Sequence, residues 1–252
     1  MDATNHFTGK AAVYSKSRPG YPDQLLTVLI EKYGWNDESV IADIGAGTGI
    51  LTGQMLNKGL NVMAVEPNTD MRLLSEQAWG DYPNYKSVNG TAEQTTLVAG
   101  NVDHITVAQA FHWFNPELFR LECQRVLKPQ RYVSLIWNSR VAERALVIEN
   151  AEICQRYCPQ FNGFSGGFEQ SDEKISSFFR SGEYEVIEMA NDLSFDRNSF
   201  IDRNLSASYA PNVQDKAFEP FVQELTALFE KYAVHGRELL MPNICKCYTG
   251  QV

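Results

Sequence analysis

The chain is 252 residues long with a hydrophobic share of 44%, which suits a packed core and excludes a disordered protein. Its 22 Lys and Arg residues against 31 Asp and Glu residues leave a formal net charge of −9, so no global field would attract nucleic acid or an anionic membrane. No run approaches the ~18 apolar residues of a membrane span, and residues 1–10 lack the layout of a signal peptide. We therefore expect a cytoplasmic protein with no membrane partner and no nucleic-acid partner.

Short apolar runs alternate with helical patterns through the first half of the chain, which is typical of a parallel sheet covered by helices on both faces. An i, i+4 stripe of Leu25, Leu29 and Tyr33 predicts a helix before the first strand. The residues at 115–117 predict the start of another helix, which should end at 128–129 because a proline follows there. Strands are expected at residues 40–44, 61–66, 85–88, 104–109 and 132–137.

The second half of the chain alternates less regularly. A helix is expected over 142–157, followed by a glycine-rich loop at 162–167. Apolar side chains at helical spacing predict another helix over 218–232. Two more strands, at 184–189 and 244–249, bring the expected number to seven. Because no repeat and no composition shift separates the halves, we predict a single domain.

The five cysteines and four histidines show no pattern of a metal or disulfide framework. The cysteine count is odd, no two cysteines have the Cys-x-x-Cys spacing, and the histidines are scattered. Tetrahedral zinc needs four ligands that converge from spaced pairs. We expect buried or inert thiols and no protein-bound metal.

A glycine-rich loop follows the first predicted strand and is the most informative segment of the sequence. Gly45, Gly47 and Gly49 stand at alternate positions before a helix, so the backbone can approach a ligand closely with amide groups exposed at the helix start. Glu66 ends the second strand, 21 positions after Gly45, where a carboxylate can accept hydrogen bonds from ribose hydroxyls. This spacing predicts a small-molecule cofactor site.

Two cofactor classes share this outline, the dinucleotides and S-adenosylmethionine. The dinucleotide pattern has glycine or alanine at its sixth place, but counting from Gly45 that place is Ile50. Asp43, at the end of the first strand, would repel a pyrophosphate and favour a cofactor that carries an ammonium and a sulfonium. In the alternative interpretation, Asp43 only ties down the loop through hydrogen bonds.

Several blocks between residues 5 and 138 follow the order and spacing of one known family. They are Phe7-Thr8-Gly9-Lys10, Tyr14, Arg18-Pro19-Gly20-Tyr21-Pro22, the loop 43–49, Ala64-Val65-Glu66-Pro67-Asn68 with Met71, Gly90-Thr91-Ala92-Glu93, the block 108–114, and Arg125-Val126-Leu127-Lys128-Pro129. On these blocks the chain resembles class I S-adenosylmethionine-dependent methyltransferases, in the small-molecule branch that includes the trans-aconitate and ubiquinone-type enzymes. It departs from the family at 129–131, where Pro-Gln-Arg stands in place of the frequent Pro-Gly-Gly.

The resemblance implies a fold class and a domain organisation. The fold would be α/β, a Rossmann-like doubly wound seven-stranded mostly parallel sheet with an antiparallel last strand and a helical cover over the cofactor pocket. The single domain 1–252 would consist of a cofactor-binding core at 1–138 with an N-terminal lid at 1–20, substrate-cover segments at 139–183 and 197–240, and last strands at 184–196 and 241–252.

The resemblance also implies cofactor-binding residues in the lid, in the glycine loop and after the second, third and fourth strands. These residues are Tyr14, Arg18, Asp43, Gly45, Ala46, Gly47, Gly49, Glu66, Pro67, Met71, Thr91, Ala92, Glu93, Gln109, Ala110 and Phe111. The cofactor would be S-adenosyl-L-methionine.

The catalytic and substrate residues are less specific. His112 directly follows the fourth strand, beside the expected methyl position, and is the candidate general base. Alternatively, it only shapes the loop. Candidate substrate residues are Trp113, Phe114, Trp137, Asn138 and Tyr209, although any of the aromatic ones can equally be ordinary core.

The predicted function is methyl transfer from S-adenosylmethionine to an oxygen, nitrogen or carbon of a small-molecule acceptor by in-line displacement. A carboxylate acceptor is suggested only by the resemblance to the trans-aconitate enzymes. The alternatives are a nicotinamide-dependent oxidoreductase and a non-catalytic module that binds S-adenosylmethionine; a methyltransferase for RNA or protein is disfavoured by the acidic charge balance. The acceptor, the need for a base and the oligomeric state are left open.

Overall fold

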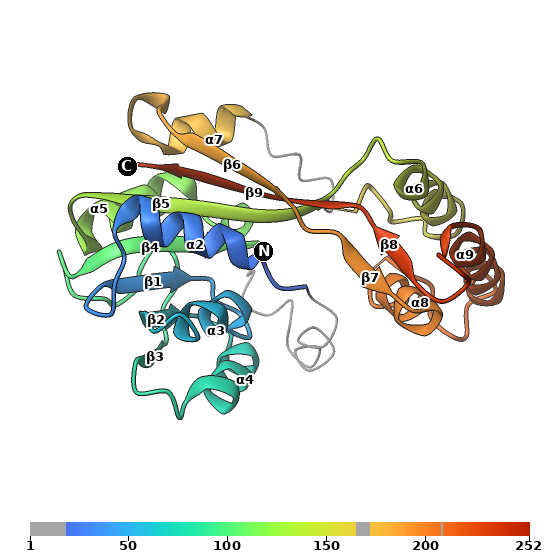
Figure 1. Ribbon diagram of the computed structural model, residues 1–252, viewed down its shortest axis with the longest axis horizontal. Helices are drawn as coiled ribbons and strands as arrows, with labels where there is room; N and C mark the ends of the chain where they lie inside the picture. Colours follow the sequence, from blue (N-terminus) through green and yellow to red (C-terminus); the bar gives the residue numbers. More distant parts are fainter. Residues whose placement is uncertain (1–18, 165–171, 208) are drawn as a thin grey trace. The chain divides into compact units, whose positions relative to one another are not determined.

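The computed structural model describes residues 19–164, 172–207 and 209–252, and the chain divides into two compact units (Figure 1). Unit 1 comprises Met1–Trp137, Gln170–Met189 and Cys245–Val252, and unit 2 comprises Asn138–Glu169 and Ala190–Ile244. Tyr14, Arg18 and the expected lid, except for its last two residues, lie outside the described residues.

A seven-stranded sheet with the order β3-β2-β1-β4-β5-β9-β6 organises unit 1. Neighbouring strands from β3 to β5 are parallel, and β9 runs antiparallel to its neighbours (Figure 1). The structure therefore confirms the predicted Rossmann-like sheet with its antiparallel last strand. The strand bounds are β1 (Val40–Ile44), β2 (Asn61–Val65), β3 (Tyr85–Val88), β4 (Val102–Ala108), β5 (Leu127–Arg140), β6 (Glu185–Ala190) and β9 (Asn243–Gly250).

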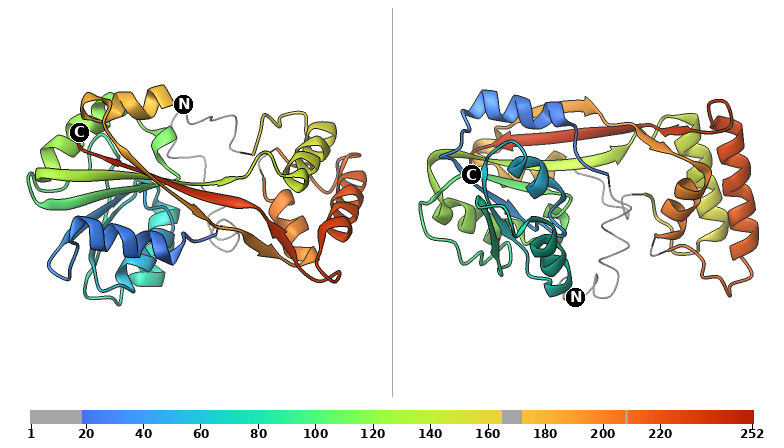
Figure 2. Two further views of the ribbon diagram at one scale, coloured as in Figure 1. Left: turned by 45° about the horizontal axis from the view of Figure 1, so that its top comes forward. Right: turned by 60° about the horizontal axis from the view of Figure 1, so that its bottom comes forward.

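Helices pack on both faces of this sheet because its buried strands alternate apolar side chains between the faces. Ile41 of β1 packs in one core cluster with α2 and α3, and Ala42 of the same strand packs in another cluster with α5 and α7. Figure 2 shows α2, in blue, along one face of the sheet. The helix bounds in unit 1 are α2 (Asp23–Tyr33), α3 (Ile50–Leu56), α4 (Thr69–Trp79), η2 (Phe111–Trp113), α5 (Pro116–Val126), α7 (Asp172–Phe178) and η3 (Arg180–Gly182).

The start of β5 differs from the expected strand at 132–137. The α5 helix ends at Val126, as expected within two residues, and pairing with β4 already begins at Leu127. The register shifts before the pair His104 and Tyr132, and Gln130 takes a φ of 61° in between. The strand is therefore irregular over the segment where the family pattern Pro-Gly-Gly is absent.

Unit 2 has its own hydrophobic core and a small antiparallel sheet of two strands, β7 (Leu193–Phe195) and β8 (Leu239–Met241). The sequence analysis missed both strands, because three residues are too few to show a period. Three helices surround this core, α6 (Ala145–Tyr157), α8 (Arg197–Leu205) and α9 (Phe218–Tyr232).

All five cysteines are buried and unpaired, as the sequence analysis expected. Within the three described ranges, no helix is long and apolar enough to cross a membrane. Over the same part of the chain, no group of three or more His, Cys, Asp or Glu side chains could hold a metal ion.

Candidate functional site

The candidate site lies at the carboxyl ends of parallel strands of unit 1. Ile44, at the end of β1, pairs with Val65, at the end of β2, and β1 also pairs with β4 in parallel. The amides of Gly45 and Ala46 both donate to the Val65 carbonyl, at 2.9 and 3.1 Å. A Cβ atom placed on Gly45 would lie 2.6 Å from the Cβ of Ala110, which follows β4. The structure therefore brings together predicted blocks that are widely separated in the sequence.

Gly47 has a different environment from Gly45, although both have a positive φ, 58° and 70°. Among the described residues, a Cβ atom on Gly47 would meet only the Sδ of Met71, at an ordinary contact distance of 3.7 Å. The side chain of Asn68 caps α4 by accepting from the Met71 amide at 3.0 Å, which holds this methionine beside the loop. The glycine loop is packed tightly at its start and leaves room at Gly47.

The carboxylate of Glu66 is held against this loop. Its Oε2 accepts from the Gly47 amide at 2.9 Å, and its Oε1 accepts from the Asn68 amide at 2.8 Å. Burial raises the pKa of Glu66, while the two amide donors oppose that shift. Each carboxylate oxygen keeps a further lone pair. Glu66 is therefore fixed in position and still able to accept hydrogen bonds from a ligand.

Asp43 is buried beneath the loop, and both of its oxygens are engaged. Its Oδ2 accepts from the Thr52 hydroxyl at 2.7 Å and its Oδ1 accepts from the Thr106 hydroxyl at 3.1 Å. Burial raises the pKa of Asp43 to about 6 against these hydrogen bonds. These hydrogen bonds agree with the alternative interpretation, in which Asp43 has only a structural role beneath the loop. A role of Asp43 toward the cofactor stays a prediction.

The residues expected around the adenine are placed less uniformly. Ala92 is buried in the core of unit 1, whereas Thr91 is exposed. The Oε1 of Glu93 accepts from the amide of Asn115 at 2.8 Å, so this side chain connects the loop after β3 to the start of α5. Pro67 is partly buried and directly follows Glu66.

The segment after β4 turns sharply and then forms η2. Gln109 has a φ of 56°, and its amide donates to the carbonyl of Ile136 in β5 at 2.9 Å. Phe111 is buried, and its ring lies 6.1 Å from that of Trp137. Trp137 itself is only 7% exposed and packs in the core of unit 1. The surroundings of Trp137 are therefore those expected of an ordinary core residue.

The other three aromatic positions after β4 are more accessible. His112 is partly buried, and its ring lies 4.9 Å from that of Trp113, which is 41% exposed. Phe114 is partly buried against the glycine loop, because a Cβ atom on Gly45 would lie 3.1 Å from its ring. These side chains border the loop without a geometry that assigns chemistry to any of them.

Two candidate substrate residues, Asn138 and Tyr209, belong to unit 2. The Oδ1 of Asn138 accepts from the side chain of Asn191 at 2.9 Å. The Tyr209 ring lies 5.0 Å from that of Phe161, at the edge of the core of unit 2.

Sequence reasoning missed two residues that shape the site. Arg72, in α4, donates from Nη1 to the backbone carbonyl of Glu66 at 3.0 Å and to the side chain of Asn89 at 3.3 Å, which joins the ends of β2 and β3. No spacing rule points to such a residue. Thr48 stands inside the glycine loop, and its buried hydroxyl has no hydrogen-bond partner among the residues described. Its place in the loop was the signal that could have identified it.

These features fit S-adenosylmethionine. Glu66 offers carboxylate lone pairs for a ribose diol, and Gly47 leaves space beside Met71. Glu66 and Asp43 are both acidic, which suits a cofactor that carries positive charge.

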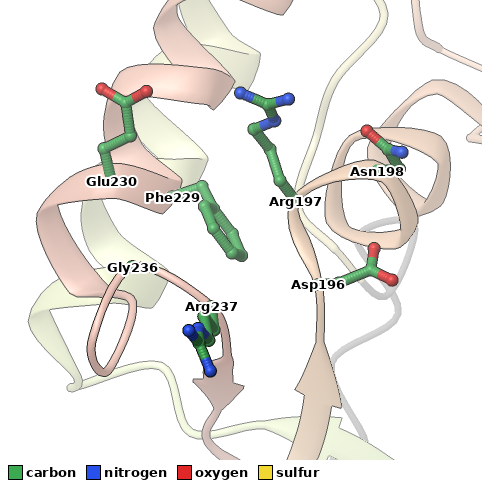
Figure 3. A pocket seen from close by; sticks show the side chains of 7 residues that line it. All are labelled: Asp196, Arg197, Asn198, Phe229, Glu230, Gly236 and Arg237. Atoms are coloured by element: carbon green, nitrogen blue, oxygen red, sulfur yellow. The ribbon is translucent and has the colours of Figure 1, made fainter.

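A separate hollow of about 370 Å³ in unit 2 contains none of the predicted site residues (Figure 3). Its charged side chains have both signs, and one of them, Asp196, caps α8 by accepting from the Ser199 amide at 2.7 Å. The lining residues are Asp196, Arg197, Asn198, Phe229, Glu230, Gly236 and Arg237.

Comparison with known proteins gives matches to methyltransferases. Residues 42–135 match the model of a methyltransferase domain family. An uncharacterised methyltransferase of Mycobacterium tuberculosis is 34% identical over 155 residues, which is 62% of this chain and 61% of that protein. The chain thus spans less than two thirds of the length of this relative.

Two solved structures share the fold. A putative type II methyltransferase from Anaeromyxobacter dehalogenans has a TM-score of 0.68 at 17% identity, with 93% of this chain and 97% of that chain covered. Phosphoethanolamine N-methyltransferase 2 of Haemonchus contortus, solved with phosphomonomethylethanolamine and S-adenosylhomocysteine, has a TM-score of 0.56 at 14% identity, with 99% and 58% covered.

Proposed function

We propose that this chain, whose residues 42–135 match a methyltransferase domain family, transfers a methyl group from S-adenosylmethionine to an oxygen, nitrogen or carbon of a small-molecule acceptor. The observation that carries the proposal is the Glu66 carboxylate, held by the amides of Gly47 and Asn68 beside an open glycine loop. A carboxylate fixed there suits the two hydroxyls of a ribose.

The other cofactor contacts in the proposal come from the loops at the same edge of the sheet. Ala46 and Gly49 complete the loop that lines the methionine and ribose portions, and Met71 borders the adenine with Pro67. Met71 is buried beside Gly47, in agreement with that role. The remaining proposed contacts are Tyr14, Arg18, Asp43, Gly45, Thr91, Ala92, Glu93, Gln109, Ala110 and Phe111.

The protein has little covalent chemistry to perform in such a reaction. Bound S-adenosylmethionine would supply a methyl group that its sulfonium already activates. The chain's residues would hold the acceptor in line with that methyl group and exclude water, which lowers the barrier through proximity and orientation. A carboxylate acceptor needs no base, whereas for a hydroxyl or amine the partly buried His112 is the candidate to remove the proton. Trp113 and Phe114 are proposed to wall the acceptor pocket.

Isothermal titration of the full chain with S-adenosylmethionine and S-adenosylhomocysteine tests the proposal. Glu66→Gln keeps one acceptor oxygen and the side-chain size but removes the charge. We therefore expect this variant to bind both compounds ~10-fold more weakly than the wild type, or weaker still, as for loss of a charged hydrogen bond. Glu117→Gln alters an exposed carboxylate of α5 and should bind like the wild type.

The absence of heat with either compound, from folded wild-type protein, would contradict the proposal. Binding of NADH in a parallel titration would favour the oxidoreductase alternative instead. Tight binding of S-adenosylmethionine with no turnover across a broad metabolite panel would favour the non-catalytic module.

A further inference from the structure

An arginine in unit 2 has a buried hydrogen-bond donor that no described residue satisfies. Arg140 is the last residue of β5, and its guanidinium carbon lies 3.6 Å from the centre of the Phe164 ring. Its Nη1 is shielded from solvent and has no hydrogen-bond partner in the part of the chain that the structure describes. A buried guanidinium donor left unmet is strongly unfavourable, so a partner from outside the chain would relieve it.

No carboxylate of the described residues compensates the charge of Arg140. Burial lowers the pKa of Arg140 to about 10, and repulsion from Arg203 of α8 lowers it further in the same direction. The groups that oppose this shift are Tyr209 and Cys154, and no carboxylate of the described chain is among them. The side chain nevertheless stays protonated near neutral pH, so it is a cation with no carboxylate counter-ion among residues 19–164, 173–207 and 209–252.

The surroundings of Arg140 select for an anion. The guanidinium of Arg140 lies on the Phe164 ring, which belongs to a chain of aromatic contacts: the rings of Phe161 and Phe164 lie 5.2 Å apart, and that of Tyr209 lies 5.0 Å from Phe161. Burial raises the pKa of Tyr209 to about 12, which keeps its hydroxyl protonated. Electrostatic attraction is stronger beside apolar surface than in water.

We infer that Arg140, together with Arg203 and Tyr209, forms a site within unit 2 that binds the oxygens of an anion, a carboxylate or a phosphate. The inference goes beyond the proposed function, because it concerns unit 2 alone. A guanidinium carries its N–H donors at the edge of its plane, which matches the planar, bidentate geometry of an oxyanion.

The test is isothermal titration of the full chain, in the presence of S-adenosylhomocysteine, with succinate, inorganic phosphate and uncharged succinamide. Arg140→Gln should weaken anion binding by ~10-fold or more, because it removes a charged, buried donor. Tyr209→Phe removes one hydroxyl and should weaken binding less. Arg197→Gln changes an exposed arginine of the same unit, in the hollow of Figure 3, and should leave the affinity unchanged.

Comparison of the two anions shows whether the site prefers a carboxylate or a phosphate. Tighter binding of succinate identifies a carboxylate ligand, tighter binding of phosphate identifies a phosphate ligand, and succinamide should not bind. Thermal unfolding of the ligand-free Arg140→Gln protein should occur at the wild-type temperature or above it, since the variant removes an unpaired buried charge. A weaker anion affinity in that variant therefore does not report a folding defect.

Three results would overturn the inference. The first is that neither anion binds to the wild type at millimolar concentration. The second is that the wild type and Arg140→Gln bind the anions with equal affinity. The third is that Arg197→Gln loses as much anion affinity as Arg140→Gln does. Binding of S-adenosylhomocysteine is titrated separately, so an anion site without a cofactor site would contradict the proposed function alone.

Discussion

At the scale of single residues, the candidate cofactor loop uses its glycines for different purposes. Gly45 lies so close to Ala110 that any side chain would collide, at 2.6 Å between Cβ atoms. Gly47 has space around it as far as the structure describes the chain, with only Met71 nearby at 3.7 Å. The first glycine serves packing between two loops, and the second leaves the room that we assign to a ligand.

Gly47→Ala should therefore have a larger effect on the free energy of cofactor binding than on the free energy of unfolding. We expect a loss of ~1–2 kcal/mol in the free energy of unfolding, because an L side chain disfavours the φ of 58°. The matched control is Gly59→Ala, with a φ of 82° and no atom within 4 Å of the added Cβ. Titration with S-adenosylhomocysteine and urea unfolding measure the two effects. Equal affinities in the two variants would show that the space at Gly47 is not used by the ligand.

At the scale of elements, one carboxylate of α5 anchors the loop that follows β3. The Oε1 of Glu122 accepts from the Thr95 amide at 2.9 Å, and its Oε2 accepts from the Nε of Arg125 at 2.7 Å. This loop also carries Thr91 and Glu93, which are expected to border the adenine. The position of these site residues therefore depends on a helix that itself contributes no predicted ligand contact.

The same carboxylate should make stability depend on pH. The guanidinium of Arg125, followed by the hydrogen bonds from Thr95, lowers the pKa of Glu122 to about 2. Because the folded-state pKa is below the unfolded value of 4.5, this stabilisation is present above about pH 4.5 and is lost as the pH falls toward 2. Glu122→Gln should thus lower the free energy of unfolding by about 2–3 kcal/mol at neutral pH.

Urea unfolding at about pH 7 and about pH 3 measures this difference between wild type and variant, which should shrink at the lower pH. Glu117→Gln, on the exposed side of α5, is the control. A difference of the same size at both pH values would mean that Glu122 acts through packing and not through its charge.

At the scale of the whole molecule, the chain builds two compact units with separate cores, and it passes from one unit to the other repeatedly. Met1–Trp137 and Asn138–Glu169 are consecutive in sequence but belong to different units. The proposed cofactor contacts that the structure describes lie in unit 1, and the proposed anion site lies in unit 2. The two ligands should therefore respond to different substitutions.

Phe221→Ala tests whether the cores are energetically separate. Phe221 is fully buried in the core of unit 2, so its truncation should destabilise that unit by ~3–5 kcal/mol. Hydrogen exchange followed by mass spectrometry should show faster exchange in unit 2, with little change in β1 and β2. Faster exchange of the same extent in both units would mean that they unfold as one.

Much of unit 1 could be predicted from the sequence because its signals are local. The start of α5 is an example, since Asn115 precedes Pro116 and its side chain accepts from the Glu117 amide at 3.1 Å. The strands of the parallel sheet are short apolar runs whose ends are marked by turn residues. The strands of unit 2 escaped prediction because three-residue strands form only through pairing with a distant partner.

The sequence by itself determined the doubly wound sheet, the glycine loop and the position of Glu66 after β2, because alternation, turn residues and spacing are properties of neighbouring residues. Only the tertiary structure decided that Trp137 packs in the core and that the Nη1 of Arg140 is buried with no partner among the described residues. Burial and charge pairing depend on which segments come together in space, and a single sequence does not record those contacts.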